Sequence, residues 1–384
     1  MGLLRLYLSL CVVCVHAGIS TWWTIHDGTQ AVQIFFLISG FYMQMIANKY
    51  PDRISFWISR AVRIYVPYFA ALVVSLVVAI GLWNLTGTRG PCSAFASNEI
   101  SRNSATGVIL ASITNVTLVG QDLTLFVKDS PDAGIALTSH VHDTPAPLYR
   151  YVLIPQAWTV SLELYFYALV PFLAMFRTRW LGLALLASLG MRFFAYMAFG
   201  LTHSPWIYRF FPFEIALFIA GMLAWRFSEQ GMPKFDVGWS KLRYLGFAIG
   251  AIVFFWGARK MVSFGVRYAD YTVVTQISYC GWLIAIPLLF QITKRHQLDR
   301  FLGELSYPIY LLHMAIIPIS VALADRHTAL HLGVLTLCLT LLCSVLFVVC
   351  LIRPLEKWRG RLHQPKTTTV VHHGTTGTST EVIS

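Results

Sequence analysis

The chain has 384 residues, of which 57% are hydrophobic and only 12% are charged. Soluble globular domains usually carry about 25% charged residues, so lipid must solvate much of this chain. The net charge of +12 is typical of some nucleic-acid-binding proteins. Here the basic residues lie between long apolar runs instead of forming one patch, which excludes nucleic acid as a partner and favours the lipid bilayer.

Ten apolar runs are candidates for membrane spans, because a helix needs roughly 20 mostly apolar residues to cross the hydrocarbon core. The first run has no small-residue cleavage site, so we expect it to be retained as a span. We therefore expect an all-α polytopic membrane protein with about ten transmembrane helices. The predicted spans are 3–22, 30–48, 64–83, 155–176, 180–200, 210–227, 244–258, 272–292, 304–324 and 332–352.

The basic residues predict the orientation of these spans. With a cytoplasmic N-terminus, roughly two thirds of the 29 basic residues fall in cytoplasmic segments. We expect both termini inside the cell and one long outer loop, residues 84–154, between the third and fourth spans. That loop either covers an outward-facing acceptor site or has no such role. We expect residues 1–364 to form the membrane domain and residues 365–384 to form a disordered cytoplasmic tail.

The cysteines do not indicate a redox or metal site, and the chain has no internal repeat. Cys11 and Cys14 form a C-x-x-C pair inside an apolar run, where we interpret them as small core residues. No cysteine or histidine spacing is typical of zinc, so we expect no metal. No internal repeat is evident, which disfavours a secondary transporter.

Ionisable residues inside apolar runs are functional candidates, because burying charge in a membrane is costly. Arg5 and His16 lie eleven residues apart in the first run, about three helical turns, and so share a face with a rise of roughly 16 Å between them. An imidazole such as His16 can take a proton from a hydroxyl at neutral pH. The alternative is a buried histidine bonded to a neighbouring carbonyl.

Three further segments carry candidate residues, each with an alternative role. Arg60 and Arg63 share a helix face and could clamp phosphates or anchor the chain at the membrane surface. Glu163 could orient an imidazole, bond a sugar hydroxyl or pair with an arginine. His313 lies in mid-helix and could be a site residue or a polar tie between helices.

Taken together, these segments resemble the acyltransferase-3 family of membrane acyltransferases. The first carries an Arg-x10-His pattern at Arg5 and His16. Similar motifs follow in sequence order up to about residue 358: Phe35-Phe36-Leu37-Ile38-Ser39-Gly40-Phe41, Arg60 and Arg63 before Pro67, Trp158-Thr159-Val160-Ser161-Leu162-Glu163, Ser306-Tyr307-Pro308-Ile309-Tyr310-Leu311-Leu312-His313, and Arg353-Pro354-Leu355-Glu356.

The resemblance implies an O-acyltransferase of the cell membrane, in bacteria the inner membrane. Its co-substrate would be a cytoplasmic acyl-CoA, most often acetyl-CoA, and its acceptor a hydroxyl of a surface or secreted glycan or glycolipid. His16 would be general base or acyl relay with Arg5 as its partner and Glu163 as a further catalytic candidate. Arg60 and Arg63 would hold the coenzyme A phosphates. Trp158, Ser161, His313 and Ser39 are further candidates from the matching motifs.

One departure and one alternative function remain. Members of the family usually have an acidic residue just before the Phe-Phe motif, where this chain has Gln33, so a charged role there is in doubt. The alternative function is a transporter or flippase for a lipid-linked or acylated molecule. Formation of an ester from labelled acetyl-CoA separates the two, because a transporter moves label without making an ester.

Overall fold

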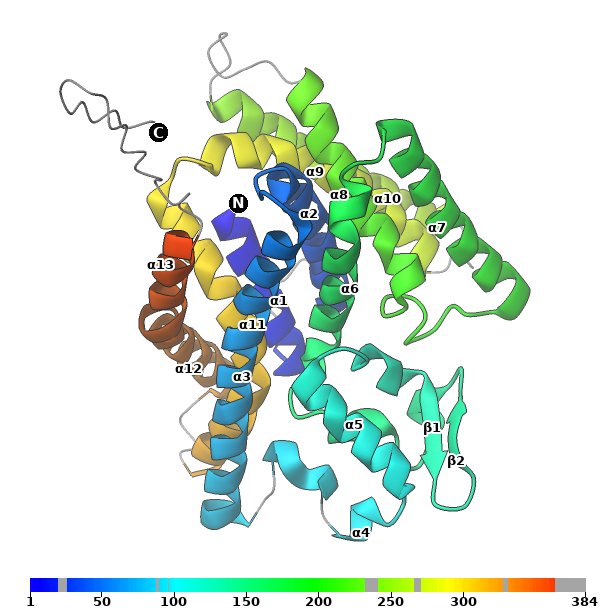
Figure 1. Cartoon of the computed structure of the whole chain (residues 1–384), viewed down its shortest axis with the longest axis vertical. Coiled ribbons are helices and arrows are strands. Elements are labelled where there is room, and N and C mark those ends of the chain that lie inside the picture. Colours follow the sequence, from blue (N-terminus) through cyan, green and yellow to red (C-terminus); the bar gives the residue numbers. More distant parts are fainter. Residues whose placement is uncertain are drawn as a thin grey trace, which may run out of the picture.

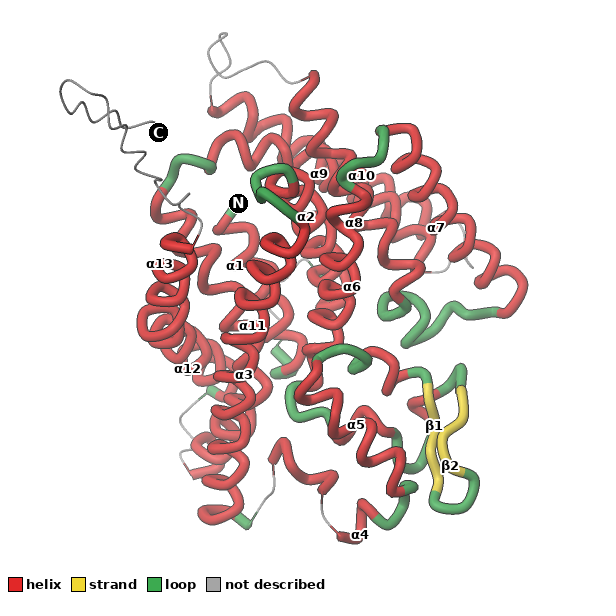
Figure 2. The backbone as a smooth tube through the Cα atoms, in the orientation of Figure 1, coloured by secondary structure: helices red, strands yellow, loops and turns green. Residues whose placement is uncertain are grey.

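The computed structural model describes residues 1–19, 26–87, 90–95, 97–231, 241–265, 271–326 and 331–362. The described chain is almost entirely helical, with one small hairpin at one end of a helix bundle (Figures 1 and 2). This confirms the prediction of an all-α polytopic membrane protein. The predicted tail, residues 365–384, lies outside the described residues.

Within the described ranges, eight helical stretches are long and apolar enough to cross a membrane. Two of the ten predicted spans correspond instead to shorter helices, α1 (Gly2–His16) and α6 (Trp158–Leu173). The eight stretches are α2 (Gly28–Ala47), α3 (Arg53–Thr86), α7 (Thr178–Phe199), α8 (Phe211–Gly231), α9 (Lys241–Gly265), α10 (Tyr271–Thr293), α11 (Gln297–Arg326), and α12 (Leu332–Phe347) continued through a π-helical turn (Val348–Ile352) into α13 (Arg353–Leu362).

Helix α1 ends earlier than predicted. The apolar run continues to residue 22, but the helix stops at His16 and Gly18 has φ of +66°. Glycine adopts this left-handed conformation without the steric cost that other residues pay, and it commonly terminates helices. His16 therefore lies in the last turn of α1, beyond which the chain turns away from the helix axis.

The predicted outer loop is a folded unit, which we call the loop domain (residues 90–157). It contains α4 (Ser97–Ile100), α5 (Ala105–Thr117) and an antiparallel hairpin of β1 (Val127–Ser130) and β2 (Gly134–Leu137). Short 3-10 turns connect them at Gly90–Phe95, Asp122–Leu125, Val141–Asp143, Leu148–Tyr151 and Pro155–Ala157. In Figure 1 the domain lies at the end of the bundle away from the N-terminus.

Side-chain-to-backbone hydrogen bonds organise the loop domain. The buried Asn115 amide donates to the carbonyl of Tyr151 at 2.9 Å, and its oxygen accepts from the backbone N–H of Leu153 at 2.7 Å. Asp129 accepts from both the backbone and the hydroxyl of Ser104 at 2.8 Å. Buried polar groups satisfied in this way hold a small domain together without a large apolar core.

Helices α2 and α8 touch backbone to backbone. A Cβ atom at Gly40 would lie 1.9 Å from the carbonyl oxygen of Phe218, and one at Gly221 would lie 2.1 Å from that of Leu37. Small residues permit this approach between membrane helices. The packing explains the glycine of the Phe-Phe-x-x-Ser-Gly-Phe motif and fixes the neighbouring Ser39 on α2.

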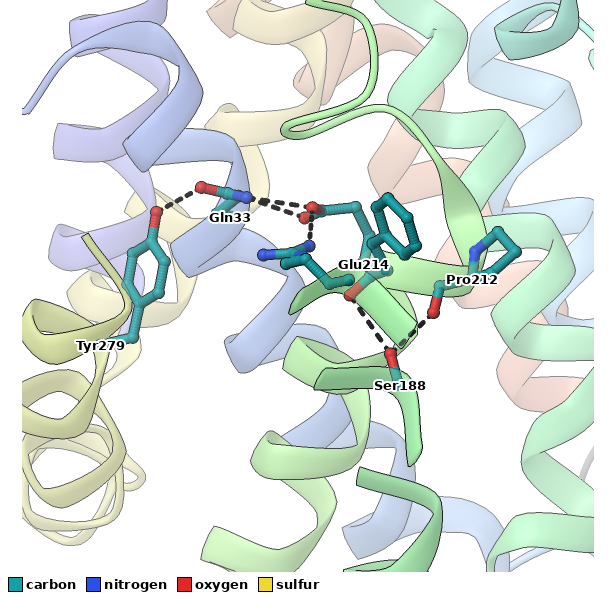
Figure 3. A network of polar contacts seen from close by, with 7 residues as sticks. Gln33, Ser188, Pro212, Glu214 and Tyr279 are labelled. Carbon is teal, nitrogen blue, oxygen red and sulfur yellow. Dashed lines mark hydrogen bonds and ion pairs between the residues drawn. The ribbon is translucent and has the colours of Figure 1, made fainter. Parts of the chain in front are cut away.

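A buried polar network links α2, α7, α8 and α10 (Figure 3). The Gln33 amide nitrogen donates to both Glu214 oxygens at 3.1 and 3.0 Å, and its oxygen accepts from the Tyr279 hydroxyl. Arg192 forms an ion pair with Glu214, with side chains 4% and 0% exposed. Gln33 is thus uncharged but lies against a carboxylate from another helix, which ties the four helices to one another.

We predict that Glu214→Ala destabilises the protein strongly. The substitution leaves the buried Arg192 guanidinium without its carboxylate, a loss that typically costs about 3–5 kcal/mol. Thermal unfolding of the full chain in detergent measures the effect. The control is Arg102→Ala, which removes an ion pair to Glu99 whose arginine is 55% exposed, and exposed pairs contribute about 0–1 kcal/mol. Equal shifts of the unfolding temperature in the two variants would contradict a stabilising role for the buried Arg192–Glu214 pair.

Candidate active site

A cavity of about 1320 Å³ opens at the end of the bundle where the chain begins. Ligand pockets usually measure roughly 300–1,000 Å³, so this one accommodates a large ligand. Residues from α1, α2, α3, α6 and α11 line it. Exposed basic residues surround the mouth, and buried hydroxyl groups line the inner part. The basic residues are Lys49, Lys294, His296 and Arg300, and the hydroxyl groups belong to Thr159, Ser306 and Tyr310.

Arg5 and Arg63 face this cavity from α1 and α3, and the charge of each acts on the other. In the described part of the chain, neither side chain forms a hydrogen bond or an ion pair. Two like charges that share a partly desolvated cavity repel each other, Glu163 offsets part of that repulsion at Arg5, and a bound anion would offset more. Guanidinium groups bind phosphate through paired N–H donors, so the arrangement suits a phosphorylated ligand.

Arg60 has a different environment from Arg63, although both line the cavity. Arg60 is 4% exposed and donates to the Tyr50 hydroxyl at 2.7 Å and to the Ser59 hydroxyl at 3.4 Å. Its guanidinium also lies 5.9 Å from the ring centre of Phe56. Arg60 therefore shapes the wall, whereas the exposed Arg63 is placed to reach a ligand.

Glu163 lies in the same cavity. Ser39 Oγ donates to its carboxylate at 2.8 Å, and the Tyr167 hydroxyl one turn along α6 donates to the same oxygen. The carboxylate also acts electrostatically on Arg5. Two predicted site residues, Ser39 and Glu163, are thus brought together from α2 and α6, with Glu163 held by neutral hydroxyls.

Tyr310 forms part of the inner wall of the cavity. Its hydroxyl donates to the carbonyl of Gln156 at 2.6 Å and lies 2.7 Å from the Thr159 hydroxyl. The Gln156 amide returns hydrogen bonds to the carbonyls of Tyr310 and Leu311 at 3.0 and 2.9 Å. These bonds fix the beginning of α6 against α11, where the wall separates the cavity from the loop end of the bundle.

Beyond this wall, His16 and His313 form a pair. His16 Nδ1 lies 2.8 Å from His313 Nε2, and the two rings are nearly parallel, at 11°, with centres 5.0 Å apart. His313 is fully buried, and its Nδ1 lies 3.2 Å from the carbonyl oxygen of Ile309. His16 is exposed and does not line the cavity.

The hydrogen bonds set the protonation of this pair. A carbonyl oxygen only accepts, so Nδ1 of His313 must donate to Ile309. Neutral His313 then has a lone pair on Nε2, and His16 Nδ1 must donate to it. The remaining nitrogen of His16, Nε2, is left unprotonated in neutral imidazole. An exposed imidazole nitrogen with a lone pair can accept a proton from a hydroxyl.

Arg5 and His16 lie in two separate parts of the site. Both are on α1, as predicted, but the roughly 16 Å rise places Arg5 in the cavity and His16 beyond its inner wall. Tyr310 and His313 connect the two parts, since their ring centres lie 6.0 Å apart on α11. Arg5 and His16, which were predicted to be partners, therefore lie at opposite ends of one helix. The direct partner of His16 is His313.

Trp158 lies on the loop side of the wall. The guanidinium of Arg209, from the segment between α7 and α8, lies 5.0 Å from the Trp158 ring centre and 4.7 Å from that of Tyr208. The two rings meet edge to face with centres 5.5 Å apart. The buried Trp158 thus packs in an aromatic and cationic cluster with residues distant in sequence.

Ser161 joins α6 to the loop domain. Its hydroxyl donates to Asp122 at 2.7 Å and accepts from the backbone N–H of Gly120 at 3.2 Å, and Tyr165 also donates to Asp122 at 2.8 Å. Burial raises the pKa of Asp122, which these hydrogen bonds partly oppose. Ser161 does not line the cavity.

A family model described as an acyltransferase domain matches residues 1–349 of this chain. The chain belongs to the acyltransferase-3 family. It is a multi-pass membrane protein, and the family supports acyl transfer as its general activity. Comparisons with curated proteins and with solved structures found no match.

Sequence reasoning missed two residues of this acyltransferase. Tyr310 stands in the quoted Ser-Tyr-x-x-Tyr motif, one turn before His313, and that spacing was a usable signal. Arg209 had no comparable signal, because its aromatic partner Trp158 lies far away in the sequence and only folding brings them together.

We predict that Ser161→Ala loosens the loop domain of this acyltransferase. Loss of the buried hydroxyl leaves Asp122 and the Gly120 N–H short of a partner, which typically costs about 1–3 kcal/mol. Limited proteolysis of residues 90–157 should accelerate. Ser112→Ala is the control, because Ser112 donates only to Val108 in its own helix at 2.7 Å. Unchanged proteolysis, with acyl transfer lost, would instead indicate a chemical role for Ser161.

Proposed function

We propose that this protein is an O-acyltransferase that moves an acyl group, acetyl in the first instance, from acyl-CoA to a hydroxyl of a surface or secreted glycan or glycolipid. The observation that carries the proposal is the arrangement of Arg5 and Arg63 in a large cavity on one side of Tyr310, with the His16–His313 pair on the other side. One part suits a phosphorylated donor, and the other supplies a base for a hydroxyl.

The cavity fits the donor better than it fits the acceptor. Coenzyme A carries several phosphates, and the cavity offers Arg5, Arg63 and a basic mouth of Lys49, Lys294 and Arg300. The predicted orientation places this mouth in the cytoplasm, where acyl-CoA is found. The acyl thioester would extend inward past Glu163 toward Tyr310.

His16 would act as the general base. Its Nε2 takes the proton of the acceptor hydroxyl while the hydroxyl oxygen attacks the thioester carbonyl carbon. The bond from that carbon to sulfur breaks, an ester forms, and coenzyme A leaves as a thiol that receives the proton. The bond from His16 Nδ1 to His313 keeps the imidazole in the required tautomer and orientation.

In this reaction the donor and the acceptor would bind at opposite ends of the bundle. The loop domain lies at the end opposite the N-terminus (Figure 1), on the outer side in the predicted orientation. The acceptor would arrive from that side, in a bacterium from outside the inner membrane. Tyr310, between the cavity and His313, stands where the acyl group would pass.

We predict that Arg63→Gln raises the KM for acetyl-CoA about 10-fold or more. A charge-assisted hydrogen bond contributes about 1.5–3 kcal/mol, and about 1.4 kcal/mol is a factor of ten. The measurement is label transfer from acetyl-CoA in membranes that contain the full chain.

The control variant is Arg53→Gln on the same helix, where the exposed arginine packs over Phe172 at 4.6 Å outside the cavity. A second control replaces acetyl-CoA with S-acetylpantetheine, which lacks the nucleotide phosphates. The Arg63 effect should shrink with this donor. An equal KM change for both donors would contradict phosphate binding by Arg63.

We predict that His16→Ala abolishes ester formation while the protein still inserts and folds in the membrane. His16→Gln should also be inactive, because an amide can bond His313 but cannot exchange the proton. His331→Ala is the matched control, since His331 is exposed and makes no side-chain cap at the start of α12. Activity retained in either His16 variant would remove the proposed base. Label that crosses the membrane without ester would favour a transporter.

A further inference from the structure

The Arg209 guanidinium lies in a surface built from three parts of the chain. It stacks against Trp158 at the beginning of α6 and against its neighbour Tyr208, as described above. The charge of Arg209 also acts on His16 and on His142 of the loop domain. The guanidinium therefore lies within electrostatic range of the region where the proposed acceptor hydroxyl meets His16.

The segment that carries Arg209 is held in place by the loop domain. The carbonyl of Ser139 accepts from the Trp206 indole N–H at 3.3 Å and lies 2.8 Å from His203 Nε2. His142 Nε2 lies 3.1 Å from the Ser204 hydroxyl. These bonds fix the segment between α7 and α8 against the loop domain, and so they fix the position of the Arg209 backbone.

Arg209 has no anion of its own within the described chain. None of the ion pairs there includes it, and its Nε is buried without a hydrogen-bond partner. Leaving a buried donor unpaired is costly, more so for a charged group. Aromatic faces attract the cation, but they do not satisfy its N–H donors.

We propose that Arg209 binds an anionic group of the acceptor, a carboxylate or a phosphate, and so presents a neighbouring hydroxyl to His16. This inference rests on the proposed function and names the class of its acceptor: an acidic sugar or a phosphate-bearing glycan. The half-buried ring of Tyr208, backed by the buried Trp158, supplies an apolar surface of the kind that packs against sugar rings, and the guanidinium supplies the charge selectivity.

The direct test measures protection of Arg209 in the full chain, without reference to catalysis. An arginine-selective dicarbonyl reagent modifies the detergent-solubilised protein, and peptide mass spectrometry follows each arginine. The samples contain sodium glucuronate, glycerol 3-phosphate, methyl glucoside, or sodium chloride at matched ionic strength. Arg150 is the internal control, because it is 46% exposed in the loop domain and pairs with Glu99 at 3.2 Å.

We expect glucuronate, glycerol 3-phosphate or both to slow Arg209 modification about 3-fold or more, while Arg150 reacts equally in all samples. Protection by glucuronate alone identifies a carboxylate, and protection by glycerol 3-phosphate alone identifies a phosphate. Equal slowing by methyl glucoside, or an Arg209 rate that is the same or undetectable in every sample, would overturn the proposal.

A second measurement connects the site to acyl transfer. With a glucuronate-containing oligosaccharide as the acceptor in membranes, Arg209→Gln should raise the acceptor KM about 10-fold while leaving the KM for acetyl-CoA unchanged, and Arg209→Lys should recover part of the loss. A lower kcat in both variants, with no change in the acceptor KM, would contradict anion binding by Arg209. If the wild type makes no ester, the proposed function fails, but the protection experiment still decides the anion site.

Discussion

The chemistry proposed for His16 depends on one backbone carbonyl, that of Ile309. Ile309 is one turn before His313 on α11, and its oxygen can only accept a hydrogen bond. That requirement places the proton of His313 on its Nδ1, so Nε2 of His313 is an acceptor. The Nδ1 of His16, which contacts this acceptor, must therefore carry the proton of His16. The exposed nitrogen of His16 keeps its lone pair. A fully buried second histidine therefore orients the first, as a carboxylate does in other catalytic arrangements.

Helix α1 connects the two parts of the site. Arg5 and Arg63 lie in a cavity where neither forms an ion pair, and His16 lies in the last turn of α1, on the other side of the Tyr310 wall. Ionisable residues in membrane segments usually pair with one another or serve a ligand. The buried network of Gln33, Arg192 and Glu214 does not line the cavity. It holds α2 in place, and α2 presents Ser39 to Glu163.

Much of the cavity lining could be predicted from the sequence. Arg5 and Glu163 stand out as ionisable residues in apolar runs, Arg63 shares a helix face with Arg60, and all of them line the cavity. The role of Ser161 could not be predicted, since its partner Asp122 lies in a segment with no periodic pattern. The end of α1 at His16 was missed because hydropathy continues past it, although Gly18 was a signal for it.

The loop domain shows a different limit of sequence reasoning. Its polar composition predicted an outer loop, yet the structure has short helices, a hairpin and several 3-10 turns. Such elements are too short for periodicity to be visible, and they are held by bonds such as those of Asn115 to Tyr151 and Leu153. Contacts of this kind depend on tertiary structure, and so does the placing of Arg209 against Trp158.

In the proposed reaction an acyl group passes from a donor on one side of the membrane to a hydroxyl on the other. Sealed inverted vesicles from cells that produce the protein test this transfer most directly, with labelled acetyl-CoA supplied outside, at the predicted cytoplasmic face. We expect labelled ester inside the vesicles, which an added esterase removes only after detergent opens them, and no ester with His16→Ala. Ester removed from intact vesicles, or label that enters without forming ester, would contradict it.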